Sequence, residues 1–314
     1  MSANSHLIPP DRWEDHESSL TLYPPSGFSI EHTLGYLTRS SNECMFHVEH
    51  GSIYKLIQAG QSLALVQVSG GPDETIRIRF MDEAAALQPG ERAAVADYVW
   101  EWLDLGVDLE PFYKLSEQDP LLSVVVPQFR GLHIVGIPDL FEALSWGIIG
   151  QQINLAFAYT LKRRFVEAFG QSVVWNGRAY WLFPEPESIA RLSVSDLTPL
   201  QFTGKKAEYI IGVAEKISEG SLSKQQLLDI GEPKAIEKEL VSIRGIGPWT
   251  ANYVLMRCLR APSAFPIADV GLHNAVKHVL GLETKPSIEQ LKQFSAPWGE
   301  WKAYATFYLW RTLY

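Results

Sequence analysis

Two glycines separated by one apolar residue are the strongest chemical signal in this sequence. Gly245 and Gly247 flank Ile246, and Pro248 follows directly. Apolar residues repeat at helical spacing on both sides, so the glycines predict a tight reversal between two helices, with amide N–H groups pointing outward. Proline suits the first position of the second helix, whose N-terminus adds a partial positive charge. Such a turn can hold a phosphate group, although glycine and proline also end many ordinary helices.

A carboxylate follows this turn at a distance that can return it to the same place. Asp269 stands twenty positions after Trp249, which is about the length of the second helix plus a short loop. It also directly precedes a helical pattern over 270–280 that stops at Gly281, so a plain N-cap is the alternative interpretation. One side chain can fill both roles, and Asp269 is the candidate catalytic residue.

The pattern as a whole resembles the helix-hairpin-helix DNA glycosylases, which excise damaged bases. Residues 240–251 together with Asp269 resemble the signature of that family. Three further regions resemble its early helix with the turn that enters the duplex, its next recurring segment and its C-terminal helix: 141–155, 203–210 and 301–310. The resemblance covers residues from about 120 to the end. Residues 22–25 and 34–37 also resemble the extra N-terminal domain of the DNA-3-methyladenine glycosylase II branch.

The resemblance implies base removal without strand cleavage. In members that also cut the strand, a lysine after the hairpin attacks the sugar, whereas Trp249 stands at that place here. Without this amine, water is the implied nucleophile and an abasic site is the product. An alkylated purine leaves readily, so a single carboxylate, Asp269, is enough to stabilise the sugar cation. The basic side chains of this region are expected on solvated faces or at DNA phosphates: Lys205, Lys206, Lys277 and Lys302.

Aromatic walls suit a flipped-out cationic base, because ring faces attract positive charge by about 0.5–2 kcal/mol per contact. By resemblance, Trp249, Tyr253 and Trp310 match positions that line the base pocket, and Tyr36 of the N-terminal domain matches an aromatic that closes the same cleft. Trp249 and Tyr253 also lie four positions apart, as core residues on one helix face often do. The pocket interpretation is favoured for Trp249 and Trp310, and the core interpretation stays open for the others.

A side chain of the protein usually fills the gap that an extruded base leaves in the stack. The candidate turn contains Gln151, Gln152 and Ile153. In the branch that this chain resembles, the wedge position usually carries an apolar residue, but Gln152 stands there. Either Gln152 bonds to the orphaned partner base or Ile153 fills the gap. Both residues equally fit an ordinary cap region between two helices.

The DNA-binding hairpin is expected to comprise four residues: Gly245, Ile246, Gly247 and Thr250. The resemblance also implies a monovalent cation that contacts a phosphate and is held by three backbone carbonyls: Val241, Ile243 and Ile246. No other cofactor is required. Some members carry a four-cysteine iron–sulfur cluster, but Cys44 and Cys258 are the two cysteines of this chain and cannot form one.

The charge distribution bears directly on a nucleic-acid partner. A net charge of −9 has the wrong sign for a typical DNA-binding protein. Residues 1–120 hold 7 Lys+Arg against 19 Asp+Glu, whereas the remainder holds 20 against 17, so the acid is concentrated in the N-terminal part. We therefore expect DNA to meet the C-terminal part through backbone amides and a few cations.

Composition and periodicity predict a globular protein with two domains. Hydrophobic residues make up 46% of the 314 positions. Alternating runs over 44–48, 53–57, 63–68 and 76–80, with helical patterns over 29–38 and 91–105, predict an α+β domain with an antiparallel sheet over 1–118. Helical patterns then predict an all-α helix-hairpin-helix glycosylase domain over 119–314. These patterns cover 139–150, 154–169, 205–219, 234–243, 248–260, 270–280 and 298–313.

No secretory signal or membrane span is expected. The N-terminus lacks a basic segment followed by an apolar core, and the most apolar run, 140–161, contains Glu142 and several amide side chains. A cytoplasmic location, close to the nucleoid if the source is bacterial, and a monomeric state are the corresponding predictions.

These observations predict a monofunctional DNA glycosylase of base excision repair that removes alkylated purines of the 3-methyladenine and 7-methylguanine type. Its partner is double-stranded DNA with damaged bases, and enzymes that process abasic sites act downstream. One alternative is the same fold acting on oxidised or deaminated bases. Another is a DNA-binding module without catalysis, in which Asp269 is only a cap and Trp249 only core. A protein–protein scaffold is a more distant alternative.

Overall fold

The computed structural model describes residues 8–81 and 87–314. The chain folds into two compact units. One unit contains the described residues up to Val107 together with Asn154–Glu185, and the other contains Asp108–Ile153 with Pro186–Tyr314. The chain therefore crosses between the units more than once.

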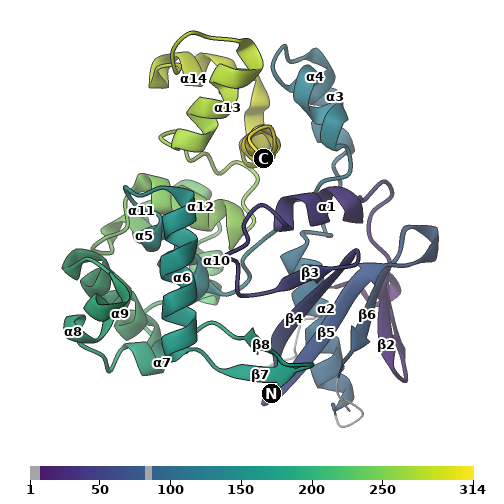
Figure 1. The fold of residues 1–314 in the computed structure, drawn as a ribbon. Coiled ribbons are helices and arrows are strands. Elements are labelled where there is room, and N and C mark those ends of the chain that lie inside the picture. The colour runs from purple at the N-terminus through teal and green to yellow at the C-terminus, as the bar shows by residue number, and fades with distance from the viewer. Residues whose placement is uncertain (1–7, 82–86) are drawn as a thin grey trace. The chain divides into compact units, whose positions relative to one another are not determined.

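The first unit is built around an antiparallel sheet of six strands in the order β1-β2-β6-β5-β4-β3. Helix α2 packs against this sheet at β2 and β4 (Figure 1). The α+β class expected for the N-terminal part is confirmed. The strands of the six-stranded sheet are β1 (Trp13–His16), β2 (Ser19–Leu22), β3 (His47–Glu49), β4 (Ser52–Ala59), β5 (Ser62–Gly70) and β6 (Ile76–Phe80). The helical elements of the first unit are η1 (Pro10–Arg12), α1 (Ile30–Leu37), η2 (Pro72–Glu74), α2 (Pro89–Trp102) and α6 (Leu155–Phe169).

A two-stranded hairpin interrupts the region that the helical periodicity predicted to be all-α. Strands β7 (Ser172–Trp175) and β8 (Arg178–Trp181) pair antiparallel, and β8 packs against β4. Tyr180 shares a buried apolar cluster with Leu56 and Leu65 of the sheet, which explains why this segment belongs to the first unit. The chain is therefore not divided at a single boundary near 118. The β7–β8 hairpin belongs to the first unit because it is buried against the sheet, and hydrophobic periodicity in the sequence does not report such burial.

The second unit is helical. Its helices of seven or more residues are α3 (Glu110–Gln118), α5 (Leu140–Ile149), α9 (Gly204–Ser218), α10 (Lys224–Ile230), α11 (Pro233–Ser242), α12 (Pro248–Arg257), α13 (Val270–Leu280), α14 (Ile288–Ser295) and α15 (Lys302–Arg311). The shorter elements are α4 (Leu122–Val125), η4 (Val126–Phe129), α7 (Pro186–Ile189), α8 (Val194–Leu197), η5 (Thr198–Leu200) and η6 (Ala296–Trp301).

Helix α5 is a buried core helix of the second unit. Every one of its residues is buried, and it packs against α9 and α12. Helices α13 and α15 pack against each other, and α15 also packs against α4. Since a helix that is apolar all round must lie inside the protein, the apolar run from 140 is a core helix. None of the helices in the described part of the chain has both the length and the apolar character that a membrane crossing requires.

Candidate active site and DNA-binding hairpin

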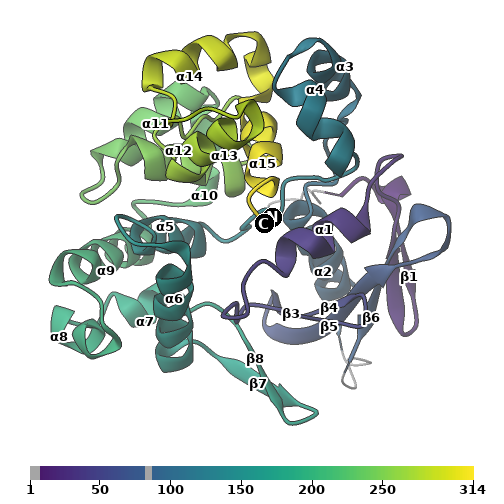
Figure 2. The same ribbon diagram turned by 45° about the horizontal axis from the view of Figure 1, so that its top comes forward.

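Helices α12, α13 and α15 lie close together (Figure 2), and Asp269 stands at the start of α13. It is the N-cap of α13, and its Oδ1 accepts a hydrogen bond from the backbone N–H of Leu272 at 2.7 Å. The indole Nε1 of Trp310 in α15 donates to the same oxygen at 2.8 Å. The indole Nε1 of Trp249 in α12 donates to Oδ2 at 2.9 Å. Three N–H donors thus orient a group that, when ionised, can only accept.

Three of the four aromatic residues predicted for the base pocket, Trp249, Tyr253 and Trp310, lie side by side next to this carboxylate. The ring centroids of Trp249 and Tyr253 are 5.6 Å apart, and those of Tyr253 and Trp310 are 6.3 Å apart. Tyr253 is 5% exposed, and its hydroxyl accepts a hydrogen bond from Arg257 at 2.9 Å. Trp249 is half-buried. The arrangement supplies aromatic surface directly beside a fixed negative charge.

Gly271 belongs to the same site, although the sequence reasoning did not select it. A Cβ at this position would lie 2.9 Å from Oδ1 of Asp269 and 3.3 Å from the indole nitrogen of Trp310. Only glycine therefore lets the first turn of α13 pass this close to the hydrogen-bonded pair. The available signal was a glycine inside an otherwise helical pattern, which often marks a packing or functional constraint.

The hairpin between α11 and α12 has the geometry that its two glycines predict. Gly245 has φ +94°, a left-handed conformation that favours glycine. Pro248 occupies the first turn of α12, and the N–H of Ala251 donates the first i to i−4 hydrogen bond of this helix, to the carbonyl of Gly247. The backbone N–H groups of Gly247, Trp249 and Thr250 precede that bond, so the helix itself leaves them available for an anion.

Known protein families and relatives match most of this chain. Residues 146–300 match the family described as HhH-GPD superfamily base excision DNA repair protein, and residues 22–144 match the N-terminal domain of 8-oxoguanine DNA glycosylase. A DNA-3-methyladenine glycosylase of Bacillus subtilis is 49% identical over 302 residues, which cover 96% of this chain and 99% of that protein. The chain belongs to the HhH-GPD superfamily.

One further protein and one solved structure are also similar to this chain. DNA-3-methyladenine glycosylase 2 of Escherichia coli is 28% identical over 182 residues, which cover 58% of this chain and 61% of that protein. A solved 3-methyladenine DNA-glycosylase of Archaeoglobus fulgidus superimposes with a TM-score of 0.77 at 25% identity, covering 92% of this chain and 96% of that one. This chain and that structure thus share a fold over nearly their full lengths.

The side chains of two predicted hairpin residues are buried rather than presented to solvent. Ile246 is 4% exposed and Thr250 is 1% exposed. Their side chains pack inside the second unit, so any contact with DNA has to come from their backbone groups. Backbone N–H groups are among the groups that contact DNA phosphates in proteins.

The wedge turn, residues 150–153, follows α5 directly. Gln152 is exposed and has φ +57°, an uncommon conformation for a residue with a side chain. Ile153 is half-buried. The more accessible of the two candidates is therefore Gln152, and the choice between them stays a prediction.

Tyr36 belongs to the first unit, where it lies in α1. It is 2% exposed, and the guanidinium of Arg39 lies 3.8 Å from the centre of its ring. Its assignment to the base pocket stays a prediction from the resemblance.

Lys206 does not lie on a solvated face, which corrects the expectation for this residue. It is 9% exposed, and its Nζ donates to the carbonyl of Ile149 at 2.7 Å. Burial lowers the pKa of its ammonium group. A long side chain that bonds to the last carbonyls of a helix stabilises the helix end, so Lys206 caps α5. Lys205 is exposed, as expected.

The carbonyl groups predicted to hold a monovalent cation lie at the C-terminal end of α11 and in the hairpin. Val241 is in the last turn of α11, where carbonyls lack helical partners. The carbonyl of Ile243 accepts a hydrogen bond from the N–H of Ile246 at 3.0 Å and keeps a second lone pair. Carbonyl oxygens are suitable ligands for hard cations, and a monovalent cation at this place stays a prediction.

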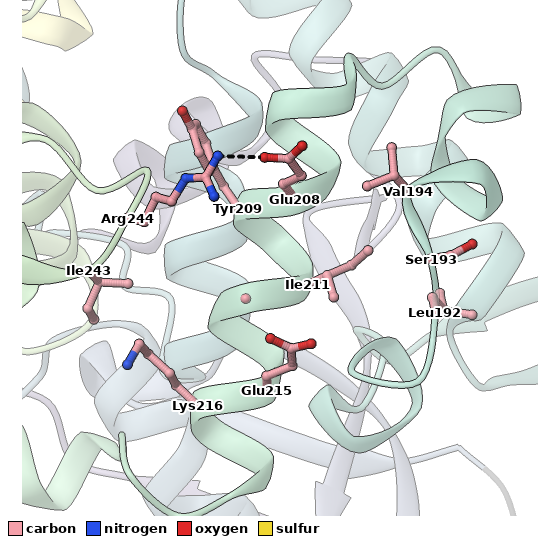
Figure 3. A pocket seen from close by; sticks show the side chains of 11 residues that line it. Leu192, Ser193, Val194, Glu208, Tyr209, Ile211, Glu215, Lys216, Ile243 and Arg244 are labelled. Atoms are coloured by element: carbon pink, nitrogen blue, oxygen red, sulfur yellow. Dashed lines mark hydrogen bonds and ion pairs between the residues drawn. The ribbon is translucent and has the colours of Figure 1, made fainter.

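A cavity of about 390 Å³ is lined by α9, by residues 192–194 and by Ile243 and Arg244, which directly precede the DNA-binding hairpin (Figure 3). At its edge the guanidinium of Arg244 donates to Glu208 at 2.8 Å. Both side chains are accessible, at 79% and 44% exposure. Asp269 and its tryptophan partners are not among the residues that line this cavity, so it is separate from the candidate active site.

Proposed function

We propose that this chain removes alkylated purines from double-stranded DNA with Asp269 as the catalytic carboxylate. It is a hydrolytic N-glycosylase of base excision repair, as its family and the 49%-identical relative indicate. The observation that carries the residue assignment is the convergence of Trp249 and Trp310 on the two oxygens of Asp269. A negative charge held between aromatic rings suits both parts of the substrate, the cationic base and the sugar cation.

The chemistry requires one bond to break and one to form. The glycosidic C–N bond breaks with its electron pair moving to the alkylated base, which leaves as a neutral molecule. The sugar then carries the positive charge, and Asp269 stabilises it electrostatically. A water molecule adds its oxygen to the sugar carbon and releases a proton, for which the carboxylate is the nearby acceptor. The product is an abasic site, which downstream enzymes process.

Trp249 is the reason to propose base removal without strand cleavage. An amine at this position would form a Schiff base with the sugar, whereas the indole nitrogen is not a nucleophile. Its N–H group is instead engaged with Asp269. The hydrolytic route therefore uses water alone.

We propose that DNA binds through the hairpin amides and the wedge turn, with the protein acting as a monomer on the cell's own DNA in the cytoplasm. A monovalent cation at the carbonyls of Val241, Ile243 and Ile246 would supply positive charge beside the bound phosphate. The hairpin contributes its amides and the N-terminal charge of α12. In this proposal the side chain of Gln152 or Ile153 occupies the gap that the extruded base leaves in the base stack.

The test of this function is the release of bases from methylated duplex DNA, followed by a search for strand breaks before and after alkali. We expect release of 3-methyladenine and 7-methylguanine, with breaks only after alkali. Breaks without alkali would contradict the hydrolytic route. Tight binding that is indifferent to damage, without any release, would instead support a DNA-binding module without catalysis.

A second candidate substrate is an oxidised purine, because residues 22–144 match the N-terminal domain of 8-oxoguanine DNA glycosylase. The same experiment with duplexes that contain 8-oxoguanine separates the two. Preferential release of the oxidised base would move the assignment to this class. The relative that matches nearly the full chain is a 3-methyladenine enzyme, which makes the alkylated base the first choice.

Arg244 is expected to contribute one phosphate contact beside the hairpin. An exposed ion pair is worth only about 0–1 kcal/mol, so a DNA phosphate can replace Glu208 as the partner of Arg244. We expect Arg244→Ala to reduce the slope of log K against log salt by about 0.9 for duplex binding. Equilibrium titrations at several salt concentrations measure this slope. In the matched variant Glu208→Gln the arginine is released, and affinity at low salt is expected to rise. An unchanged slope in Arg244→Ala would place this side chain away from the DNA.

A further inference from the structure

Gln151 connects the wedge turn directly to the hairpin. Its side-chain Nε2 donates to the carbonyl of Gly245 at 2.9 Å and to the hydroxyl oxygen of Thr250 at 3.1 Å. A carbonyl can only accept, so the amide nitrogen has to face Gly245 and the orientation of the side chain is settled chemically. Both N–H bonds of this amide are used, one on each side of the start of α12.

Two other contacts hold the same elements together. A Cβ on Gly147 would lie 2.6 Å from the Cγ2 of Thr250, so α5 and α12 approach closely at a position where glycine is needed. Lys206 caps the last residue of α5 through the carbonyl of Ile149. The end of α5 is thus fixed against both α9 and α12, and the wedge turn begins at this fixed end.

This arrangement has a mechanical consequence for base extrusion. Gln152, the accessible wedge candidate, follows Gln151 in the chain and has a left-handed backbone conformation. A phosphate on the hairpin and a side chain in the base stack would therefore be positioned by one connected body. Their separation would then decide which nucleotide leaves the duplex.

We propose that Gln151 is a positioning residue that couples phosphate binding at the hairpin to insertion of the wedge turn. The inference rests on the proposed function, since it assigns a role within base extrusion. Removing the amide leaves the hairpin to bind the backbone but lets the wedge turn move independently of it. Binding of undamaged duplex should therefore survive while extrusion of a paired base is impaired.

The variants are Gln151→Leu, which keeps similar bulk without the donors, and Gln151→Glu, which places a carboxylate oxygen against the carbonyl of Gly245. The matched control is Gln226→Leu, because Gln226 also donates its Nε2 to a glycine carbonyl, that of Gly220 at 3.1 Å, on an exposed helix away from the site. Each protein is compared with wild type in thermal unfolding and in affinity for undamaged duplex.

Two readouts test the coupling. The first is base release in single turnover from a paired lesion and from the same lesion placed in an unpaired bulge, where extrusion requires little unstacking. We expect Gln151→Leu to slow release from the paired lesion about ten-fold and from the bulge less than about two-fold, with Gln151→Glu at least as impaired. The second is the fluorescence gain of 2-aminopurine next to the lesion upon binding, which reports unstacking without catalysis and is expected to fall in both variants.

The outcomes separate this inference from the proposed function. Failure of wild type to release any base would remove the proposed function, and the fluorescence arm would still decide the coupling. Equal slowing on paired and bulged substrates would mean that Gln151 supports the fold or the active site generally and would overturn the inference. Unchanged release and fluorescence in both Gln151 variants would overturn it as well.

Discussion

Replacing Asp269 with asparagine is expected to slow base release by about 10²–10³-fold, while affinity for lesion-containing duplex stays within about two-fold. The substitution removes the negative charge that stabilises the sugar cation but keeps the size of the side chain. Asparagine is also a good N-cap, so the hydrogen bond from Leu272 that begins α13 is retained. Single-turnover release from methylated duplex, with binding measured on the same DNA, checks this expectation.

The asparagine variant changes one further interaction, which needs its own control. Because Oδ1 accepts from both Leu272 and Trp310, the asparagine oxygen is expected to stay there and its amide group to face the N–H of Trp249, so one hydrogen bond to the side chain is lost. Trp249→Phe removes one such bond while leaving the charge and an aromatic ring in place. We expect this control to lose less than about ten-fold in rate, a reduction consistent with one hydrogen bond. A loss as large as that of Asp269→Asn would assign the effect to geometry rather than to charge.

Local signals predicted the parts of the site that lie close together in the chain. Pro248 occupies the first turn of α12, and Asp269 caps α13, which ends at Gly281 in the left-handed conformation. These features depend on a few neighbouring residues, so their sequence signature is strong. The role of Trp310 in orienting the carboxylate depends on a residue 41 positions away, and no local pattern reports the direction of an indole N–H group.

The fold shows the same contrast between local and distant information. Strand β6 covers Ile76–Phe80, and helix α13 covers Val270–Leu280, the same limits as their apolar patterns. The hairpin of β7 and β8 was missed despite a clear signal, because Asn176-Gly177 with φ values of +49° and +76° is the preferred pair for a two-residue turn. Its membership of the first unit follows from contacts with β4 that lie far away in the sequence.

The two hairpin glycines were indistinguishable in sequence, but the structure gives them different requirements. Gly245 has φ +94°, and a Cβ there would collide with the ring of Tyr209. Gly247 has φ −93°, and no atom lies within 4 Å of the position of its Cβ. A side chain at 247 is therefore compatible with the turn itself.

Gly245→Ala is therefore expected to weaken the binding of undamaged and lesion-containing duplex alike, with at least about a hundred-fold loss of affinity for each. The left-handed conformation costs an alanine about 1–2 kcal/mol, and the collision with Tyr209 requires the backbone of the turn to move. Displaced amides no longer converge on one phosphate. Titration of undamaged and lesion-containing duplexes measures the loss, and thermal unfolding shows how much of it reflects the fold.

Two companion variants identify which part of the glycine requirement matters. In Gly245→Ala/Tyr209→Ala the collision is relieved but the conformational cost remains, so only part of the affinity should return. Gly247→Ala should unfold at the wild-type temperature, because its backbone suits any residue, yet bind duplex more weakly if its open side is where the phosphate approaches. Full affinity in Gly247→Ala would show that DNA meets another face of the turn, and full affinity in Gly245→Ala would remove the hairpin from DNA binding altogether.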